Sequence, residues 1–151
     1  MADIQNYLVP DKAPELPKGR KKEQDGSKEL ATPLVANVDA ERVILAAILL
    51  DNEAFLEASE KIQPDDFFLD SHRRIFLRMK DLMDENRTID IVTLANELTK
   101  NKEVSIVGGV AYLADLTLGV PRRPVIAEYI RIIKDKSLAR KIICLAGETT
   151  V

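Results

Sequence analysis

The chain has 151 residues, of which 46% are hydrophobic and 31% are charged, and its net charge is −3. This length suits one ordinary domain with its own core, and two domains would be crowded. The longest unbroken apolar run, Val43 to Leu50, is far shorter than the roughly 20 residues that cross a bilayer, so no membrane span is predicted. A slightly acidic domain also suits tight phosphate-backbone binding poorly, because that affinity comes mainly from Lys and Arg.

Residues 1–33 are predicted to form a disordered tail. They hold four of the seven prolines and alternate charges with Gly, Ser and Gln, so they cannot bury enough apolar surface to order themselves. The basic cluster Lys18–Lys22 could serve as a nucleic-acid or targeting patch, but nearby acidic residues dilute it. A solvated tail is therefore favoured.

The first helix is predicted from Asn37 to Leu50. Asn37 is a good N-cap, and Asp39 and Glu41 lie in the first turn, where carboxylates complement the helix dipole. All eight residues from Val43 to Leu50 are apolar, so no polar face remains after the first turn. A buried strand is the alternative for such a run, but the two adjacent alanines and the acidic capping turn favour a helix at the centre of the core.

A second, short helix is predicted next. Asp51 and Asn52 interrupt the chain and can cap this helix, and Pro64 ends it. Its inner face comprises Phe55, Ala58 and Ile62.

A third helix is predicted after the connection Asp65–Leu69, with Asp70 or Ser71 as its cap. Its apolar residues recur every three or four positions and predict a core stripe: Ile75, Phe76, Met79, Leu82 and Met83. The back of the helix is charged. Arginine-rich helices can face a duplex, but Asp70, Asp81, Asp84 and Glu85 flank Arg73, Arg74, Arg78 and Lys80. We expect a solvated face with intrahelical pairs.

Two further short helices are predicted. Thr88–Asp90 starts the fourth, whose apolar residues follow the i, i+3, i+4, i+7 pattern: Ile91, Leu94, Ala95 and Leu98. The segment Val107–Gly109 precedes the fifth, which runs from Val110 to Leu118 and packs through Leu113 and Leu116.

The last predicted helix runs from Val125 almost to the end of the chain, after a linker confined by Pro121 and Pro124. It carries two apolar stripes that are slightly out of phase: Ile126, Tyr129, Ile130 and Ile133, then Leu138, Ile142 and Leu145. The helix either rotates its contact face or breaks near residues 134–137. So much apolar surface has little else in this chain to pack on, which implies a partner surface.

No catalytic, cofactor or metal site is predicted. His72 is the single histidine and lacks partners at metal or catalytic spacing, so an exposed or helix-packing side chain is favoured. The pair Asp65 and Asp66 could hold Mg²⁺ or do acid-base work, but caps and loop solubilisers are the favoured interpretation. Gly108–Gly109 could hold an anion, yet no complete phosphate-loop motif occurs, and a tight turn is favoured.

The single cysteine, Cys144, cannot form an internal disulfide, which fits a reducing cytoplasm. The N-terminus shows no export signal. Cys144 lies in the apolar run Ile142–Ala146 and is expected to be a small core residue.

Five segments in order resemble the N-terminal domain of the bacterial replicative DNA helicase, the DnaB-type family. They are residues 37–52 (NVDAERVILAAILLDN), 64–68 (PDDFF) with 72–76 (HRRIF), 89–95 (IDIVTLA), 108–114 (GGVAYLA), and Ile126 with residues 129–133 (YIRII), Lys136 and Arg140. The resemblance covers about residues 33–146. Two departures are Ala46 and Ala47, where the family commonly has glycine, and Arg122–Val125, where it usually has small residues and an asparagine.

This resemblance implies an all-α fold: a compact bundle of about five to six helices (residues 34–120), then a long C-terminal helix (residues 121–151) that is the first arm of a helical hairpin. It implies pairing of subunits, as dimers and as a trimer of dimers in a hexamer, and docking of primase and of a helicase loader. ATP, Mg²⁺ and single-stranded DNA would bind a motor domain that these residues do not include, so the chain is not expected to be an enzyme alone. The candidate subunit interface is Ile126, Tyr129, Ile130, Ile133, Leu138, Ile142 and Leu145.

The leading hypothesis is therefore an assembly and interaction domain of a cytoplasmic hexameric replicative helicase. A free-standing helical adaptor and a small helical DNA-binding protein are the alternatives.

Overall fold

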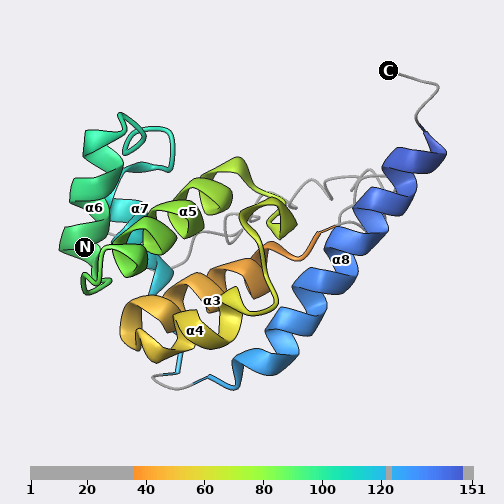
Figure 1. Cartoon of the computed structure of the whole chain (residues 1–151), viewed down its shortest axis with the longest axis horizontal. Coiled ribbons are helices and arrows are strands. Elements are labelled where there is room, and N and C mark those ends of the chain that lie inside the picture. The colour runs from red at the N-terminus through yellow and green to blue at the C-terminus, as the bar shows by residue number, and fades with distance from the viewer. Residues whose placement is uncertain (1–35, 122–123, 148–151) are drawn as a thin grey trace, which may run out of the picture.

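The structure is a computed structural model that describes residues 36–121 and 124–147. Within these ranges the chain forms six α-helices and one short 3₁₀ helix without any strand, which confirms the all-α prediction (Figure 1). The elements are α3 (Val38–Leu50), α4 (Glu53–Ser59), η1 (Pro64–Asp66), α5 (Asp70–Asp84), α6 (Ile91–Lys100), α7 (Gly109–Leu116) and α8 (Ile126–Ala146). The predicted tail of residues 1–33, its basic cluster Lys18–Lys22, and Arg122 lie outside the described residues. The domain boundaries stay a prediction.

Helix α3 is the centre of the bundle, as its apolar sequence predicts. The side chain of Asn37 accepts a hydrogen bond from the Ala40 amide at 3.0 Å and caps the helix. Every residue from Ile44 to Ile48 is buried, and α3 contacts α4, α5, α7 and α8. A helix covered on so many sides needs no polar face.

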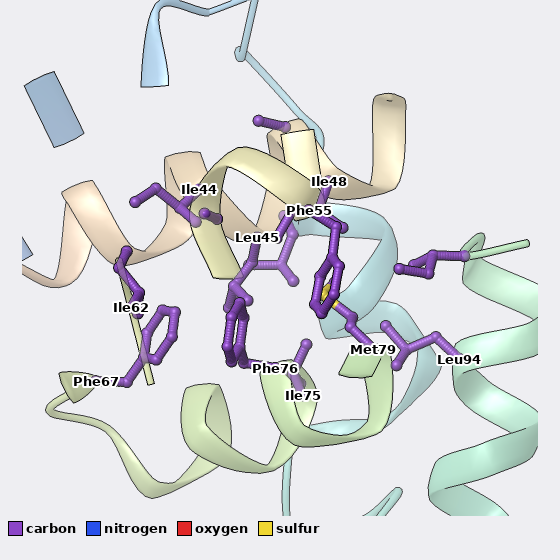
Figure 2. Packing of buried hydrophobic residues seen from close by; sticks show 14 of the residues in the cluster. Ile44, Leu45, Ile48, Phe55, Ile62, Phe67, Ile75, Phe76, Met79 and Leu94 are labelled. Carbon is purple, nitrogen blue, oxygen red and sulfur yellow. The ribbon is translucent and has the colours of Figure 1, made fainter. Parts of the chain in front are cut away.

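Three phenylalanine rings join α4, the residue after η1, and α5 in the core below α3. The ring of Phe76 lies 5.5 Å from that of Phe55 and 5.1 Å from that of Phe67, measured between centroids (Figure 2). Phe67 comes from the short connection before α5 and is fully buried. The connection is thereby anchored to the core through its aromatic side chain.

Two predicted helix limits differ from the structure. Helix α4 ends at Ser59, before the expected stop at Pro64, and Ile62 is buried from the following turn. Pro64 instead starts η1, because proline fits the first turn of a helix and holds the preceding Gln63 in an extended conformation. Helix α7 starts at Gly109, after Gly108 with a φ of 106°, and a Cβ at Gly108 would lie 3.0 Å from that of Tyr112. The glycine pair is thus a tight turn, as predicted.

Helix α8 is continuous from Ile126 to Ala146, so of the two predicted alternatives the break near residues 134–137 does not occur. It runs antiparallel to α3: Ile126 lies beside Ala47 and Asp51 near the end of α3, whereas Arg140 lies within electrostatic reach of Glu41 in the first turn of α3 (Figure 1). The expectation that this helix has little to pack on is therefore wrong for its first half. Its last residues, 141–146, are all exposed.

Candidate functional site

The structure divides the seven candidate interface residues into two sets. Ile126, Ile130 and Ile133 are at most 4% exposed and belong to the core of this chain, and Tyr129 packs against the same core. Three of these side chains are therefore unavailable to a partner while the domain is folded. The other three candidates are exposed: Leu138 (58%), Ile142 (56%) and Leu145 (67%). Whether they form a subunit interface stays a prediction.

Leu138, Ile142 and Leu145 follow each other at i, i+4 and i+7, so they form one stripe along the last turns of α8. We call these three residues the arm stripe. Ile143, which the sequence analysis did not single out, is 53% exposed on the same turns. Cys144 is exposed as well, so its expected place in the core is wrong, because α8 outruns the elements beneath it. A protein rarely leaves such a cluster open to water without a partner.

A buried carboxylate, Asp66, holds the middle of α8. Its Oδ1 lies 2.6 Å from the Ser137 hydroxyl and its Oδ2 lies 3.0 Å from Lys134 Nζ. Lys141 Nζ is 3.8 Å from Oδ1, and Arg140 donates to the Asp66 carbonyl oxygen. Asp66 and these four α8 residues form what we call the α8 clasp.

Asp66 combines a predicted role with an unexpected one. Its Oδ2 accepts a hydrogen bond from the Gln63 amide at 2.8 Å, which confirms the predicted cap. The side chain is only 3% exposed, however, so the expectation of a solubilising residue is wrong for Asp66, whereas Asp65 is exposed. Burial raises the pKa of Asp66, but the hydrogen bonds from Gln63, Ser137 and Lys134 outweigh it and leave this pKa below its ordinary value.

A second buried polar group connects α3, α5 and α7. Glu41 Oε1 accepts hydrogen bonds from the amides of Phe68 at 2.7 Å and Leu69 at 3.4 Å, and so caps α5 from a distant helix. The N-cap residue of α5 is Leu69, and no side-chain cap hydrogen bond forms there. The prediction that Asp70 or Ser71 caps this helix is therefore wrong. Because the amides at a helix start lack partners within the helix, a buried carboxylate stabilises them.

His72 completes this group. It is fully buried, with Nε2 2.6 Å from the Tyr112 hydroxyl and Nδ1 3.5 Å from Glu41 Oε1. It is therefore a helix-packing histidine and not an exposed one. Burial, together with the nearby Glu41 charge, raises the pKa of Tyr112, although Arg42 opposes the shift. The His72 ring itself has no exposed surface and packs between the helices.

Two of the four basic residues of α5, Arg74 and Arg78, pair with carboxylates within the fold. Arg74 pairs with Asp70 at 2.7 Å and with Glu103 at 3.0 Å. Arg78 pairs with Asp81 at 2.6 Å and with Glu103 at 3.1 Å. The predicted intrahelical pairs are confirmed, and Glu103 adds a long-range partner that leaves this face poorly suited to binding phosphates.

In the part of the chain that the structure describes, no group of three or more His, Cys, Asp or Glu side chains could hold a metal ion. Every helix in the same residues falls short of the length and apolarity that a bilayer crossing requires.

Comparison with known proteins gives consistent matches. The family model of the DnaB-like helicase N terminal domain matches residues 34–135. The chain is 38% identical over 129 residues to the replicative DNA helicase DnaB of Buchnera aphidicola, which covers 85% of this chain but only 28% of that relative. Among solved structures, the N-terminal domain of DnaB helicase from Mycobacterium tuberculosis has a TM-score of 0.73 at 27% identity and covers 76% of this chain and 83% of its own.

A further solved structure adds similarity of fold. It is the N-terminal domain of DnaB helicase from Helicobacter pylori, described together with its interactions with primase. Its TM-score is 0.65 at 23% identity, and the match covers 83% of this chain and 94% of that one.

Proposed function

Because the chain belongs to the DnaB-like helicase N-terminal domain family, we propose that it is the assembly and protein-interaction domain of a hexameric replicative DNA helicase. The observation that carries this proposal is the arm stripe, Leu138, Ile142 and Leu145, which is apolar and exposed at the end of α8. The hydrophobic core holds the first half of α8, and the α8 clasp holds its middle. The last turns of the helix therefore extend from a fixed position. The chain spans 28% of the Buchnera relative, and the helicase activity, with its ATP, Mg²⁺ and single-stranded DNA, is proposed for the whole parent protein.

The proposed partners follow from this assignment. The arm stripe pairs with a second copy of the chain, and three such pairs form the hexamer. Primase and a helicase loader dock on the assembled domains in the cytoplasm. The Helicobacter pylori relative, whose structure is described with its interactions with primase, supports the primase assignment.

Replacing Ile142 by Asp is expected to weaken self-association by at least about tenfold, because a buried, unpaired charge at an interface costs more than about 1.4 kcal/mol. Size-exclusion chromatography with light scattering across a concentration series measures this. Val92→Asp is the matched control, since Val92 is 77% exposed on α6, and it should leave association unchanged. A monomer at every concentration, or equal association of wild type and Ile142→Asp, would refute pairing through the arm stripe.

Capture of primase separates the helicase domain from a free-standing adaptor. We expect the purified chain to retain the C-terminal domain of the cognate primase, whereas a protein that does not bind helicases should not be retained. If primase shows no binding to the chain alone or to the full parent helicase, the docking assignment fails.

A further inference from the structure

The last turns of α8 have little apolar packing on the rest of the chain. Ser137 is the last buried residue of the helix, with 2% exposure, and residues 141–146 are all exposed. A helix extends in the direction set by its last fixed contacts. The contacts nearest the arm stripe therefore decide where the stripe points.

Those last contacts differ in chemistry from the earlier ones. The first half of α8 is held by apolar packing of Ile126, Ile130 and Ile133. From Lys134 onward, the described fixed contacts centre on Asp66: Lys134 and Ser137 bond to its carboxylate, and Arg140 bonds to its carbonyl. The last turns of α8 thus begin at polar contacts, of which those of Lys134, Ser137 and Lys141 depend on the Asp66 carboxylate.

Asp66 is itself rigidly placed. Phe67 is fully buried beside the ring of Phe76, and Arg73 of α5 donates to the Phe67 carbonyl at 2.8 Å. Arg73 also donates to the Phe68 carbonyl at 3.1 Å, and the guanidinium of Arg140 lies 5.6 Å from the centre of the Phe68 ring. The carboxylate therefore links α8 to a connection that the core fixes on its other side.

We propose that Asp66 is a positioning residue that fixes the direction of the last turns of α8, and that loss of its charge loosens the attachment of these turns to the core. The importance of this positioning for assembly rests on the proposed function. The claim that Asp66 fixes the direction of the helix concerns only this chain. Removing the charge ends the ion pairing with Lys134 and leaves a single good acceptor oxygen where Ser137, Lys134 and the Gln63 amide now share two. The last turns of α8 then lose their defined direction while the apolar first half stays in place.

Spin-label distances within one chain test the proposal. Cys144 is the single cysteine and is exposed on the arm, and Val92→Cys supplies a second exposed site on α6. The doubly labelled chain is diluted with unlabelled chain, so that distances between copies do not contribute. We expect one narrow distance distribution in this background, and a distribution at least about twofold broader after Asp66→Asn.

Asp65→Asn is the matched control, because Asp65 is the adjacent, exposed carboxylate, and it should keep the narrow distribution. Ser137→Ala removes one bond of the clasp without touching the connection and should broaden the distribution in part. If both Asp66→Asn and Ser137→Ala stay as narrow as the background, the proposal is overturned. If Asp66→Asn fails to fold, Ser137→Ala decides alone.

A pH series separates positioning from general stability. Because the pKa of Asp66 lies below its ordinary value of 3.8, the clasp is complete above that value and is lost as the pH falls through the folded-state pKa. The background chain should broaden over that acidic range while its circular dichroism still reports helix, and Asp66→Asn should show no such step. Broadening that coincides with global unfolding in both chains would overturn the proposal.

Failure of the clasp and failure of the proposed function give different results. A broadened distance distribution in a chain that never self-associates supports the clasp and refutes the arm as a pairing surface. Normal association together with an unchanged distance distribution after Asp66→Asn refutes the clasp and supports the arm stripe as a pairing surface.

Discussion

Phe76→Ala is expected to lower the free energy of unfolding by about 3–5 kcal/mol, because it removes a buried aromatic ring and leaves a cavity. Phe76 is 1% exposed, and its ring contacts those of Phe55 and Phe67 (Figure 2). The loss reaches both α4 and the connection that carries Asp66. No neighbouring side chain of comparable size is free to fill the space, since the surrounding cluster is itself buried.

Urea denaturation followed by circular dichroism measures this change. Leu56→Ala is the control, because Leu56 is 56% exposed on α4, next to Phe55, and should cost less than about 0.5 kcal/mol. A loss below about 1.5 kcal/mol for Phe76→Ala would show that the three rings are not the packed centre that the structure describes.

The helices follow from local sequence patterns. The predicted inner face of α5 is the stripe Ile75, Phe76, Met79, Leu82 and Met83. The first four residues are buried, and Met83 is partly buried against the core. Asn37 and Asp90 mark the starts of α3 and α6, and both side chains accept capping hydrogen bonds, as predicted for Asn37. These features depend on residues at most a few positions apart, so one sequence suffices to find them.

The buried polar groups do not follow from local patterns, because their partners are far apart in the chain. Glu41 caps the start of α5 from 27 residues away, and Asp66 bonds Ser137 from 71 residues away. A signal was nevertheless present: His72 precedes Ile75 and Phe76 at i, i+3 and i+4, in phase with a core stripe. A polar residue in phase with an apolar stripe predicts a buried group that needs a partner.

The sequence also contains a signal that the candidate interface residues divide into a buried set and an exposed set. The stripe that starts at Ile126 and the stripe that starts at Leu138 are out of phase, which predicts either a break or a change of contact face. The helix is continuous, so the second explanation holds. Periodicity alone does not show which stripe the chain itself covers, because that depends on where α3 begins beside α8.

Glu41→Ala is expected to lower the free energy of unfolding by about 2–4 kcal/mol, although the only apolar group that the substitution removes from the core is a single methylene. The amides of Phe68 and Leu69 lose their acceptor, and His72 keeps only the Tyr112 hydroxyl as a partner. Buried donors without acceptors cost free energy because water satisfied them in the unfolded chain. The lost free energy therefore comes mainly from the donors that Glu41 leaves unsatisfied, and less from the contacts of its own side chain.

Thermal and urea denaturation of Glu41→Ala and Asp39→Ala compare two acidic residues of the same helical turn. Asp39 is exposed, so its replacement should cost less than about 1 kcal/mol, mainly through the helix dipole. Glu41→Gln keeps an acceptor oxygen of similar shape and should recover part of the loss, since an amide oxygen can still accept from Phe68. If Glu41→Ala and Asp39→Ala cost the same, the carboxylate acts only on its own helix, as a first-turn residue, and the cap on α5 contributes no stability.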